Sequence, residues 1–307
     1  MSREPLIVLS GPTASGKSAL ALALCRRFPL EIVNADSVQV YRGLDIGSAK
    51  PSPRDRAEVP HHLVDVAEPG EGYNAGRFVR EAQEAILRIR GRGRVPLVVG
   101  GTGMYLRALL RGLDPLPSDP RVRDALRTRW DREGGEGLYR ELARVDPATA
   151  ERVHPADRVR VLRALEIAQA AGVPASALRS SWSGGGQRHR LLFLALRAAD
   201  RALLYRRIDD RVEAMLRGGL LEEVRSLLAR GYRPGLPALR SLGYRHLLAH
   251  VVEGQPLDRA VEEMKRDTRR YAKRQMTWLS AEPGVLWIDA GAGAEEEAAA
   301  HVARFLS

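Results

Sequence analysis

A glycine-rich stretch near the N-terminus has the spacing of a phosphate-binding loop. Residues 11–18 read GPTASGKS and match the pattern G-x-x-x-x-G-K-[ST] at every position, between an expected strand and an expected helix. Glycines let the backbone approach phosphate oxygens, and successive amides at a helix start offer a positive field. We expect Lys17 to contact terminal phosphate oxygens and the Ser18 hydroxyl to reach a magnesium ion. The phosphate-binding candidates are Gly11, Pro12, Thr13, Ala14, Ser15, Gly16, Lys17 and Ser18.

The strand that would complete an ATPase site lacks its carboxylate. ATPases and kinases with such a loop usually pair it with an apolar strand that ends in Asp and helps to hold magnesium. The best such strand here, residues 95–99, ends in Gly100, Gly101 and Thr102 instead. This weakens an ATPase interpretation, but a small-molecule or nucleoside kinase remains an alternative.

The nearest candidate carboxylate follows the second expected strand. Residues 34–39 read NADSVQ, and in a doubly wound sheet this turn shares an edge with the phosphate loop. Asp36 is a candidate general base, magnesium ligand or helix N-cap. Ser37 and Gln39 can hydrogen-bond the edge of a base, and Thr102 would place a hydroxyl on the same edge of the sheet.

Apolar runs that alternate with helical patterns predict an α/β fold with a doubly wound, mostly parallel sheet and its site at the strand C-termini. Strands are expected at residues 6–10, 31–34, 62–66, 95–99, 190–196 and 285–289. Helices are expected at residues 17–28, 76–90, 199–230, 257–279 and 294–305.

The middle of the chain is helical in pattern throughout. Residues 121–178 follow a proline-rich hinge at 114–120, and residues 183–186 read as a loop. We therefore expect an all-helical insertion in the α/β core. The predicted parts are the first part of the core, the insertion, and a return to the core with C-terminal helices, at residues 1–113, 114–189 and 190–307.

Composition narrows the function classes. The 307 residues carry 49 Lys and Arg against 38 Asp and Glu, a net charge of +11, which favours polyanion partners such as nucleic acid, phosphates or an anionic membrane surface. Solubility alone could also explain this charge. The single cysteine, Cys25, excludes an internal disulfide and a multi-cysteine zinc site. Without a signal peptide or a run of about 20 apolar residues, we expect a cytoplasmic protein that does not enter membranes.

Basic residues gather in two helical stretches. Arg152, Arg158, Arg160 and Arg163 lie in the expected insertion, and seven more, between Arg259 and Arg274, lie on the helix at 257–279. Such density fits tracking of a nucleic-acid backbone, although a solvated, salt-bridged helix face is the plainer alternative. Three aromatic residues are candidates either for stacking on splayed bases or for core packing, namely Tyr244, Tyr271 and Trp278.

Several stretches together resemble the tRNA dimethylallyltransferases, also called tRNA isopentenyltransferases. Besides the phosphate loop, the matching stretches read DSVQVY, DIGSAKP, PHHL, GGTGMY, DRVRVLRALE, LGYR and KRQMTW, at residues 36–41, 45–51, 60–63, 100–105, 157–166, 242–245 and 273–278. The resemblance covers most of the chain. It implies transfer of a dimethylallyl group from its diphosphate to the exocyclic amine of the adenosine 3′-adjacent to the anticodon.

The resemblance also implies roles for individual residues. The loop would hold the diphosphate together with Arg211. Asp36 would be the catalytic base, with Thr102 as a second catalytic hydroxyl, while Lys17 and Mg²⁺, the latter bound by Ser18, would stabilise the leaving group. Expected tRNA contacts are Asp36, Ser37, Val38, Gln39, Thr102, Arg123, Val159, Arg160, Val161, Leu162, Arg163, Arg240, Ser241, Leu242, Gly243, Tyr244, Arg245, Lys273, Arg274, Gln275 and Trp278.

The expected partners are dimethylallyl diphosphate and a tRNA anticodon stem-loop, bound by a monomer. Besides the kinase, two alternatives remain: a relative that prenylates free adenine nucleotides, and a non-enzymatic RNA-binding protein. Two further signals are interpreted as structural. We read the acidic run at residues 209–213 as helix-surface ion pairs and expect no zinc at His246 and His250.

Overall fold

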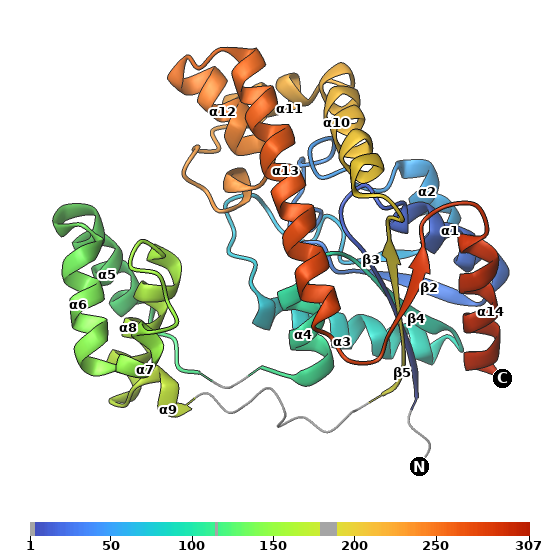
Figure 1. Ribbon diagram of the computed structural model, residues 1–307, viewed down its shortest axis with the longest axis horizontal. Coiled ribbons are helices and arrows are strands. Elements are labelled where there is room, and N and C mark those ends of the chain that lie inside the picture. Colours follow the sequence, from blue (N-terminus) through green and yellow to red (C-terminus); the bar gives the residue numbers. More distant parts are fainter. Residues whose placement is uncertain (1–3, 114–115, 179–188) are drawn as a thin grey trace. The chain divides into compact units, whose positions relative to one another are not determined.

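The computed structural model describes residues 4–113, 116–178 and 189–307, which fall into two compact units. One unit comprises Met1–Leu110 with Gln187–Ser307, and the other comprises Arg111–Gly186 (Figure 1). Of the predicted hinge at residues 114–120, the first two residues lie outside the described part of the chain. The predicted loop at residues 183–186 lies outside it entirely.

A parallel six-stranded sheet forms the centre of the larger unit. Its order is β3-β2-β4-β1-β5-β6, and every neighbouring pair is parallel. The strands are β1 (Pro5–Ser10), β2 (Leu30–Asn34), β3 (His61–His62), β4 (Val95–Val99), β5 (Arg190–Arg197) and β6 (Val285–Asp289). The expected α/β fold is therefore confirmed. The strand expected at 62–66 is wrong beyond His62, because Leu63 and Asp65 adopt positive φ angles of 63° and 58° that end the extended backbone.

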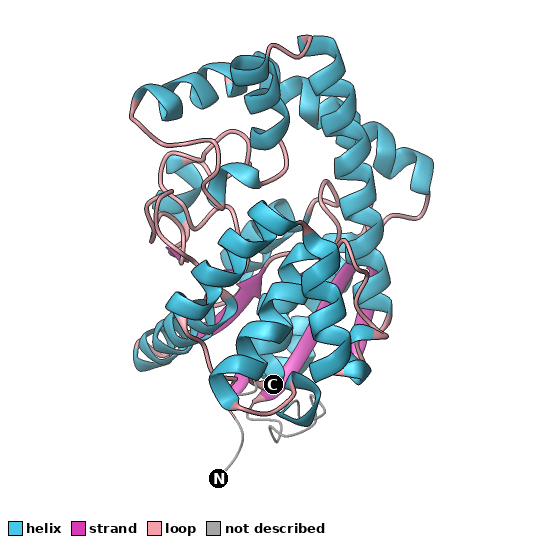
Figure 2. Cartoon of the chain, turned by 90° about the vertical axis from the view of Figure 1, so that its left-hand side faces the viewer, coloured by secondary structure: helices cyan, strands magenta, loops and turns pink. Residues whose placement is uncertain are grey.

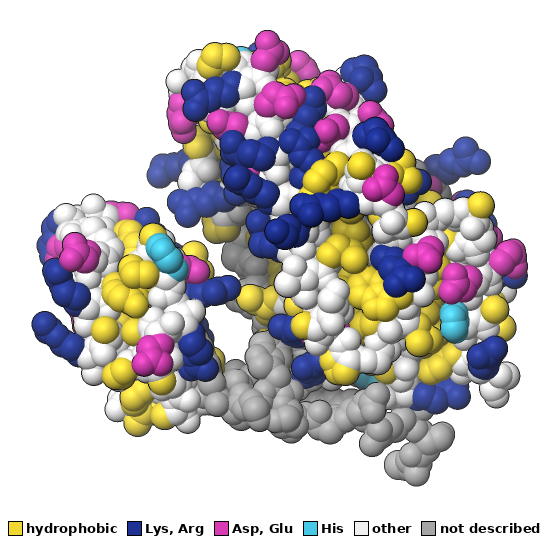
Figure 3. Space-filling view, viewed as in Figure 1, with side chains coloured by type: hydrophobic (Ala, Val, Ile, Leu, Met, Phe, Trp, Pro, Cys, Tyr) yellow, Lys and Arg dark blue, Asp and Glu magenta, His cyan; other side chains and the backbone are white. Residues whose placement is uncertain are grey.

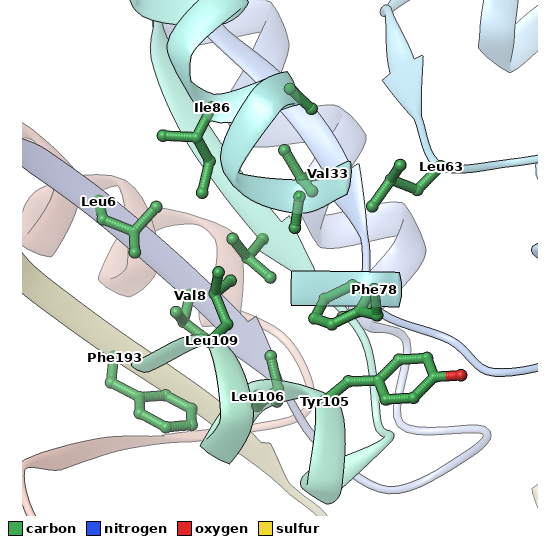
Figure 4. Packing of buried hydrophobic residues seen from close by; sticks show 14 of the residues in the cluster. Leu6, Val8, Val33, Leu63, Phe78, Ile86, Tyr105, Leu106, Leu109 and Phe193 are labelled. Carbon is green, nitrogen blue, oxygen red and sulfur yellow. The ribbon is translucent and has the colours of Figure 1, made fainter. Parts of the chain in front are cut away.

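Helices cover both faces of this sheet (Figure 2). On one face pack α1 (Lys17–Arg27) and α14 (Ala294–Leu306), and on the other α3 (Ala75–Gly91) and α4 (Gly103–Arg111). The second face holds the aromatic pair of Phe78 and Tyr105, whose rings stack with centroids 4.5 Å apart (Figure 4). These two layers bury the apolar strands on both sides, which is why β1 and β4 read as continuous apolar runs.

A helical layer of the same unit lies beyond the C-terminal ends of the strands. It comprises α10 (Arg201–Arg217), α11 (Leu220–Ala229), the 3₁₀ turn η1 (Ala238–Arg240), α12 (Tyr244–Glu253) and α13 (Leu257–Ser280). These helices share an apolar cluster with Val40, Tyr41 and Leu44. The single helix expected at 199–230 is wrong, because the chain breaks at Gly218 and Gly219, where φ is +95° at the second glycine. The short α2 (Pro53–Glu58), α4 and α12 were not predicted.

The smaller unit is all helical in its described part. It contains α5 (Pro120–Glu133), α6 (Gly135–Val145), α7 (Pro147–Ala150), α8 (Arg158–Ala171) and α9 (Ala175–Leu178) around its own apolar cluster. Glu166 of α8 is 1% exposed and lies between Arg123 and Arg163, at 2.8 and 2.9 Å. Such a buried carboxylate is tolerated because both cations, with Ser118 and a backbone amide, satisfy its oxygens.

Candidate active site

The phosphate loop connects the end of β1 to the start of α1. Gly11 has φ +152°, and a Cβ there would lie 2.8 Å from Ser15 Oγ and 3.0 Å from the Leu196 carbonyl oxygen. Gly16 has φ +91° and precedes the first residue of α1, Lys17. Glycine is needed at both positions, at Gly11 for space and at Gly16 for its left-handed backbone. The loop therefore places its last amides at a helix N-terminus, as anion binding requires.

A cavity of about 650 Å³ opens beside this loop within the larger unit. It brings together residues from distant parts of the sequence. The predicted site residues that line it are Thr13, Ala14, Gly16, Lys17, Ser18, Asp36, Ser37, Val38, Gln39, Arg211, Arg240, Ser241, Leu242, Arg245, Arg274 and Gln275. The cavity thus joins the predicted phosphate-binding residues, except Gly11, Pro12 and Ser15, to part of the predicted RNA-binding set.

Two cations and one carboxylate face each other in the cavity. Burial lowers the pKa of Lys17 from 10.5 to about 8, and the nearby Arg211 guanidinium adds to this, while the Asp36 carboxylate opposes it. Burial also lowers the pKa of Arg211, again opposed by Asp36. Two partly buried cations on one cavity form a site that an anion would stabilise.

Asp36 is a turn cap as well as a candidate base. Its Oδ1 accepts hydrogen bonds from the amides of Val38 and Gln39, at 2.8 and 3.3 Å. Among the described residues, its Oδ2 accepts no hydrogen bond. One oxygen therefore fixes the carboxylate, and the other remains able to take a proton.

Thr102 supports the turn that carries Asp36. Its Oγ1 accepts a hydrogen bond from the Ser37 amide at 3.1 Å and lies 3.4 Å from Ser37 Oγ. Thr102 is not one of the residues lining the cavity. The contacts of this hydroxyl thus position the turn.

The strand end before Thr102 must approach the Asp36 turn closely. A Cβ at Gly100 would lie 2.8 Å from Ala35 Cα and closer still to the Ala35 carbonyl. We expect Gly100→Ala to lower the free energy of unfolding by about 1–3 kcal/mol, because backbone must move. It should also reduce activity, since Ala35 precedes Asp36. Urea unfolding followed by circular dichroism checks the first expectation, and an unchanged midpoint contradicts it. Gly91→Ala, at a position with open space, is the control.

Gln275 was predicted to contact tRNA, but its side-chain amide is hydrogen-bonded to the backbone of the protein. The residue is 6% exposed, its Oε1 accepts a hydrogen bond from the Thr13 amide at 2.8 Å, and its Nε2 donates to the Gly101 carbonyl at 3.0 Å. Gln39 is similar, because its Nε2 donates to the carbonyls of Ser48 and Ala49. The side-chain N–H groups of both glutamines, including that of Gln39 expected at a base edge, therefore donate to backbone carbonyls.

Of the three aromatic candidates, only Tyr271 lines the cavity. Tyr244 is fully buried and donates its hydroxyl hydrogen to Glu223 at 2.6 Å. Trp278 packs against the core beside Phe193 and lies under the Arg107 guanidinium. In the structure, Tyr244 and Trp278 are packing residues and do not offer a ring face for stacking.

Tyr271 is the site residue that the sequence reasoning undervalued. Burial raises the pKa of its hydroxyl to about 12, and the nearby Asp36 carboxylate adds to this. Tyr271 precedes Gln275 by four residues on α13, so both side chains fall on the same helix face. The spacing of four residues indicates that Tyr271 faces the cavity only when the inward direction of Gln275 is already known.

The predicted basic residues divide into free and paired groups. Lys and Arg side chains gather along α13 and its neighbours (Figure 3), where Lys273 and Arg274 are exposed and Arg240 lies close to the cavity. Arg270 is also exposed, but it pairs with Asp267 at 3.3 Å. Arg245 also pairs with Asp267, at 2.6 Å.

In the smaller unit, the predicted RNA-binding run is only partly at the surface. Val161 and Leu162 are buried in the apolar cluster, so their side chains are not available for RNA. Arg123 and Arg163 hold the buried Glu166. Val159, 78% exposed, and Arg160 are at the surface, and the exposed Arg152 lies nearby in the sequence.

The acidic run at residues 209–213 forms ion pairs between helices. Asp209 pairs with Arg269 at 2.7 Å, and Glu213 pairs with Lys265 at 2.7 Å, so α10 and α13 are joined by charge. The structural interpretation of this run is confirmed, although its partners lie on another helix.

Within the described ranges, no three His, Cys, Asp or Glu residues come together as metal ligands. His246 contacts Asp267, and His250 contacts the Gln255 carbonyl. A hard divalent cation at the phosphate loop would therefore be bound by the Ser18 hydroxyl, by water and by oxygens of a phosphate ligand. That donor set fits a magnesium–diphosphate ligand and does not fit a protein-held metal centre. In the same described part of the chain, no helix is both long and apolar enough to cross a membrane.

Two family models match the chain. The model described as IPP transferase matches residues 39–282, and the one described as isopentenyl transferase matches residues 5–61. Among curated proteins, the chain is 53% identical over 285 residues to tRNA dimethylallyltransferase 1 of Citrifermentans bemidjiense, covering 92% of each chain. It is 50% identical to the tRNA dimethylallyltransferase of Bordetella petrii, covering 95% of this chain and 94% of that one.

Solved structures agree with these matches. The tRNA isopentenylpyrophosphate transferase of Bacillus halodurans superposes with a TM-score of 0.73 at 34% identity, covering 99% of this chain and 97% of that chain. A eukaryotic dimethylallyltransferase acting on tRNA gives a TM-score of 0.78 at 29% identity, covering 98% of this chain and 77% of that chain.

Proposed function

The chain belongs to the IPP transferase family and transfers a dimethylallyl group to tRNA, and from that premise we propose how the residues of its cavity carry out this transfer. The donor that we propose is dimethylallyl diphosphate, and the acceptor is the exocyclic amine of the adenosine 3′-adjacent to the anticodon. One observation carries the assignment of roles: Asp36 shares a cavity with the phosphate-loop Lys17 and with Arg211.

The diphosphate would lie against the loop amides, Lys17 and Arg211. The cavity holds two cations whose pKa values are lowered chiefly by burial, and a bound anion would stabilise their charged forms. Mg²⁺, held by Ser18 and the diphosphate oxygens, would supply further stabilisation of the negative charge on the leaving group. These groups are fixed before the reaction, as electrostatic preorganisation requires.

Asp36 would act on the other substrate. An adenine amine is a weak nucleophile because its lone pair is delocalised into the ring. A carboxylate that takes the proton as the amine attacks typically contributes about 10²–10⁴-fold. As the C–N bond forms, the allylic C–O bond breaks, the proton moves to Asp36 Oδ2, and the electron pair leaves with the diphosphate. The amides that hold Oδ1 keep the carboxylate in place, and Thr102 keeps the turn in place.

The adenine must leave its stack to reach this cavity. We propose that the exposed basic residues around the cavity contact the RNA backbone and that Tyr271 contacts the extruded base. The proposed contacts in the larger unit are Ser37, Arg240, Ser241, Leu242, Lys273 and Arg274. Those proposed in the helical unit are Val159 and Arg160, with Arg123 and Arg163 acting through Glu166 as supports of α8. We propose that the protein acts as a monomer in the cytoplasm.

A transfer assay tests the proposal. Purified protein, magnesium and dimethylallyl diphosphate are mixed with an unmodified anticodon stem-loop, and the RNA is analysed by mass spectrometry. A five-carbon gain on the RNA and none on AMP is expected. A gain on AMP alone would indicate a nucleotide prenyltransferase. ATP consumption with small alcohols, without any prenyl transfer, would indicate a kinase.

The rate should depend on the protonation of Lys17. In the free protein its pKa is about 8, so the cation that receives the diphosphate is present below pH 8 and is lost above it. We expect kcat/KM for the donor to fall above pH 8, because this parameter reports the free enzyme. A bound diphosphate raises the pKa, so kcat should fall only at higher pH. Stopped assays from pH 6 to 10 measure both profiles. Lys17→Arg should remove the fall in kcat/KM, and an unchanged profile in that variant would contradict the assignment.

A further inference from the structure

Gln275 of α13 joins the phosphate loop to the strand end that leads to the catalytic turn. Its Oε1 accepts the Thr13 amide hydrogen at 2.8 Å, and its Nε2 donates to the Gly101 carbonyl at 3.0 Å. Because one partner is an N–H and the other a carbonyl, the orientation of the side-chain amide is fixed. Only a side chain of this length with both a donor and an acceptor satisfies the two buried groups.

The backbone is shaped around this amide. A Cβ at Gly101 would overlap Gln275 Nε2, so glycine leaves the space that the amide occupies. The next residue, Thr102, accepts a hydrogen bond at 3.1 Å from the backbone amide of Ser37, the residue that directly follows Asp36. A continuous series of contacts therefore runs from the diphosphate loop through Gln275 to the turn that carries the base.

Helix α13 has a second contact with the loop on the same face. Ala272 is fully buried in a small apolar cluster with Leu204 and Ile208 of α10, against which Ala14 of the loop packs. Lys273 and Arg274, between Ala272 and Gln275, are exposed. One helix thus presents basic residues outward and fastens the phosphate loop inward.

We propose that Gln275 is a positioning residue that holds the phosphate loop and the Asp36 turn at a fixed separation and contacts neither substrate. The proposal rests on the proposed function. In that reaction, the base and the leaving-group site act at the same moment on two partners, so a small error in their separation lowers the rate steeply. Gln275 is the side chain that bonds to both sides.

Two separate titrations test this assignment. In Gln275→Met, the Thr13 amide and the Gly101 carbonyl lose their partners while the side-chain volume is nearly kept. We expect the Kd of inorganic diphosphate with magnesium to rise at least about tenfold, and kcat to fall about 10²-fold, as a misplaced reacting group would cause. The Kd of the stem-loop RNA should change little. The opposite pattern, weaker RNA binding with unchanged diphosphate binding, would overturn the proposal and make Gln275 an RNA contact.

Gln275→Glu supplies a readout that a purely structural role would not produce. A protonated glutamic acid can accept from Thr13 and donate to Gly101, whereas the carboxylate repels the Gly101 carbonyl. The activity of this variant relative to the wild type should therefore rise as the pH falls. Taking the ratio cancels the titration of the other charged or titratable groups that line the cavity, namely Lys17, Asp36, Lys50, Asp55, His61, Arg211, Arg240, Arg245, Tyr271 and Arg274. A ratio that does not change with pH would overturn the proposal.

Gln83 of α3 provides the matched controls, because it does not line the cavity. Gln83→Met and Gln83→Glu should leave both dissociation constants and the pH ratio unchanged. Thermal unfolding of each variant checks the fold, and the Glu variant keeps the test valid if the Met variant is unstable. If the wild-type protein transferred nothing to RNA, the proposed function would fail, while the dependence of diphosphate binding on Gln275 would be measured independently.

Discussion

Replacing Asp36 with Asn should lower kcat for prenyl transfer by about 10²–10⁴-fold. The substitution removes the base and keeps an oxygen that can accept the Val38 amide, so the turn should survive. Donor binding should not weaken at pH 7, because the lost carboxylate is a negative charge near the diphosphate site. Single-turnover transfer to the stem-loop, followed by mass spectrometry, measures the rate, and calorimetry measures donor affinity.

The control for this experiment is Asp289→Asn. Asp289 is an exposed residue that pairs with Arg197 at 2.7 Å, and a surface pair of this kind contributes about 0–1 kcal/mol. It should leave the transfer rate unchanged. If Asp36→Asn also transferred at the wild-type rate, Asp36 would be a turn cap and nothing more.

Replacing Lys17 with Met should have opposite effects on activity and stability. Removing one preorganised cation from a leaving-group site lowers kcat by about 10²–10³-fold, and donor affinity should fall as well. The fold, however, should become more stable at pH 7 by about 1–3 kcal/mol, because a partly buried, desolvated cation beside Arg211 is removed.

The stability gain has a definite pH window. Burial lowers the pKa of Lys17 from 10.5 to about 8, so the charged form opposes folding below pH 8. This penalty decreases as the pH rises from 8 to 10.5 and then disappears. Urea unfolding of wild type and Lys17→Met at pH 7 and pH 10.5 measures the difference. A variant less stable than the wild type at pH 7 would mean that Lys17 is not desolvated in the free protein.

The stretches whose structure could be predicted from the sequence are those in which neighbouring residues alone determine the backbone conformation. The phosphate loop is defined by glycines at fixed spacing and by its place between a strand and a helix, so the sequence correctly predicts a loop that connects β1 to α1. The buried strands were visible as apolar runs, and α13 as a long amphipathic pattern. Asp36 was visible because a polar turn after a parallel strand must lie at the functional edge of the sheet.

Contacts between distant residues could not be derived in this way. Nothing near Tyr244 in the sequence shows that its hydroxyl binds Glu223, and nothing near Gln275 shows that its partners are Thr13 and Gly101. A polar or aromatic side chain on a helix is compatible with solvent, RNA or the core. Which of these environments the side chain has depends on which face of the helix the neighbouring elements cover, and the local sequence does not show this.

The sequence by itself determined the phosphate loop, the parallel α/β fold and the identity of the base candidate, because glycine spacing and apolar periodicity are properties of short stretches. The tertiary structure alone decided which polar groups remain available for substrates. In the folded chain, the side-chain amide of Gln275 is hydrogen-bonded to two backbone groups, and Arg163 pairs with the buried Glu166. Tyr271, in contrast, lines the cavity. Most buried polar groups need a hydrogen-bond partner, and the folded chain supplies that partner from residues far apart in the sequence.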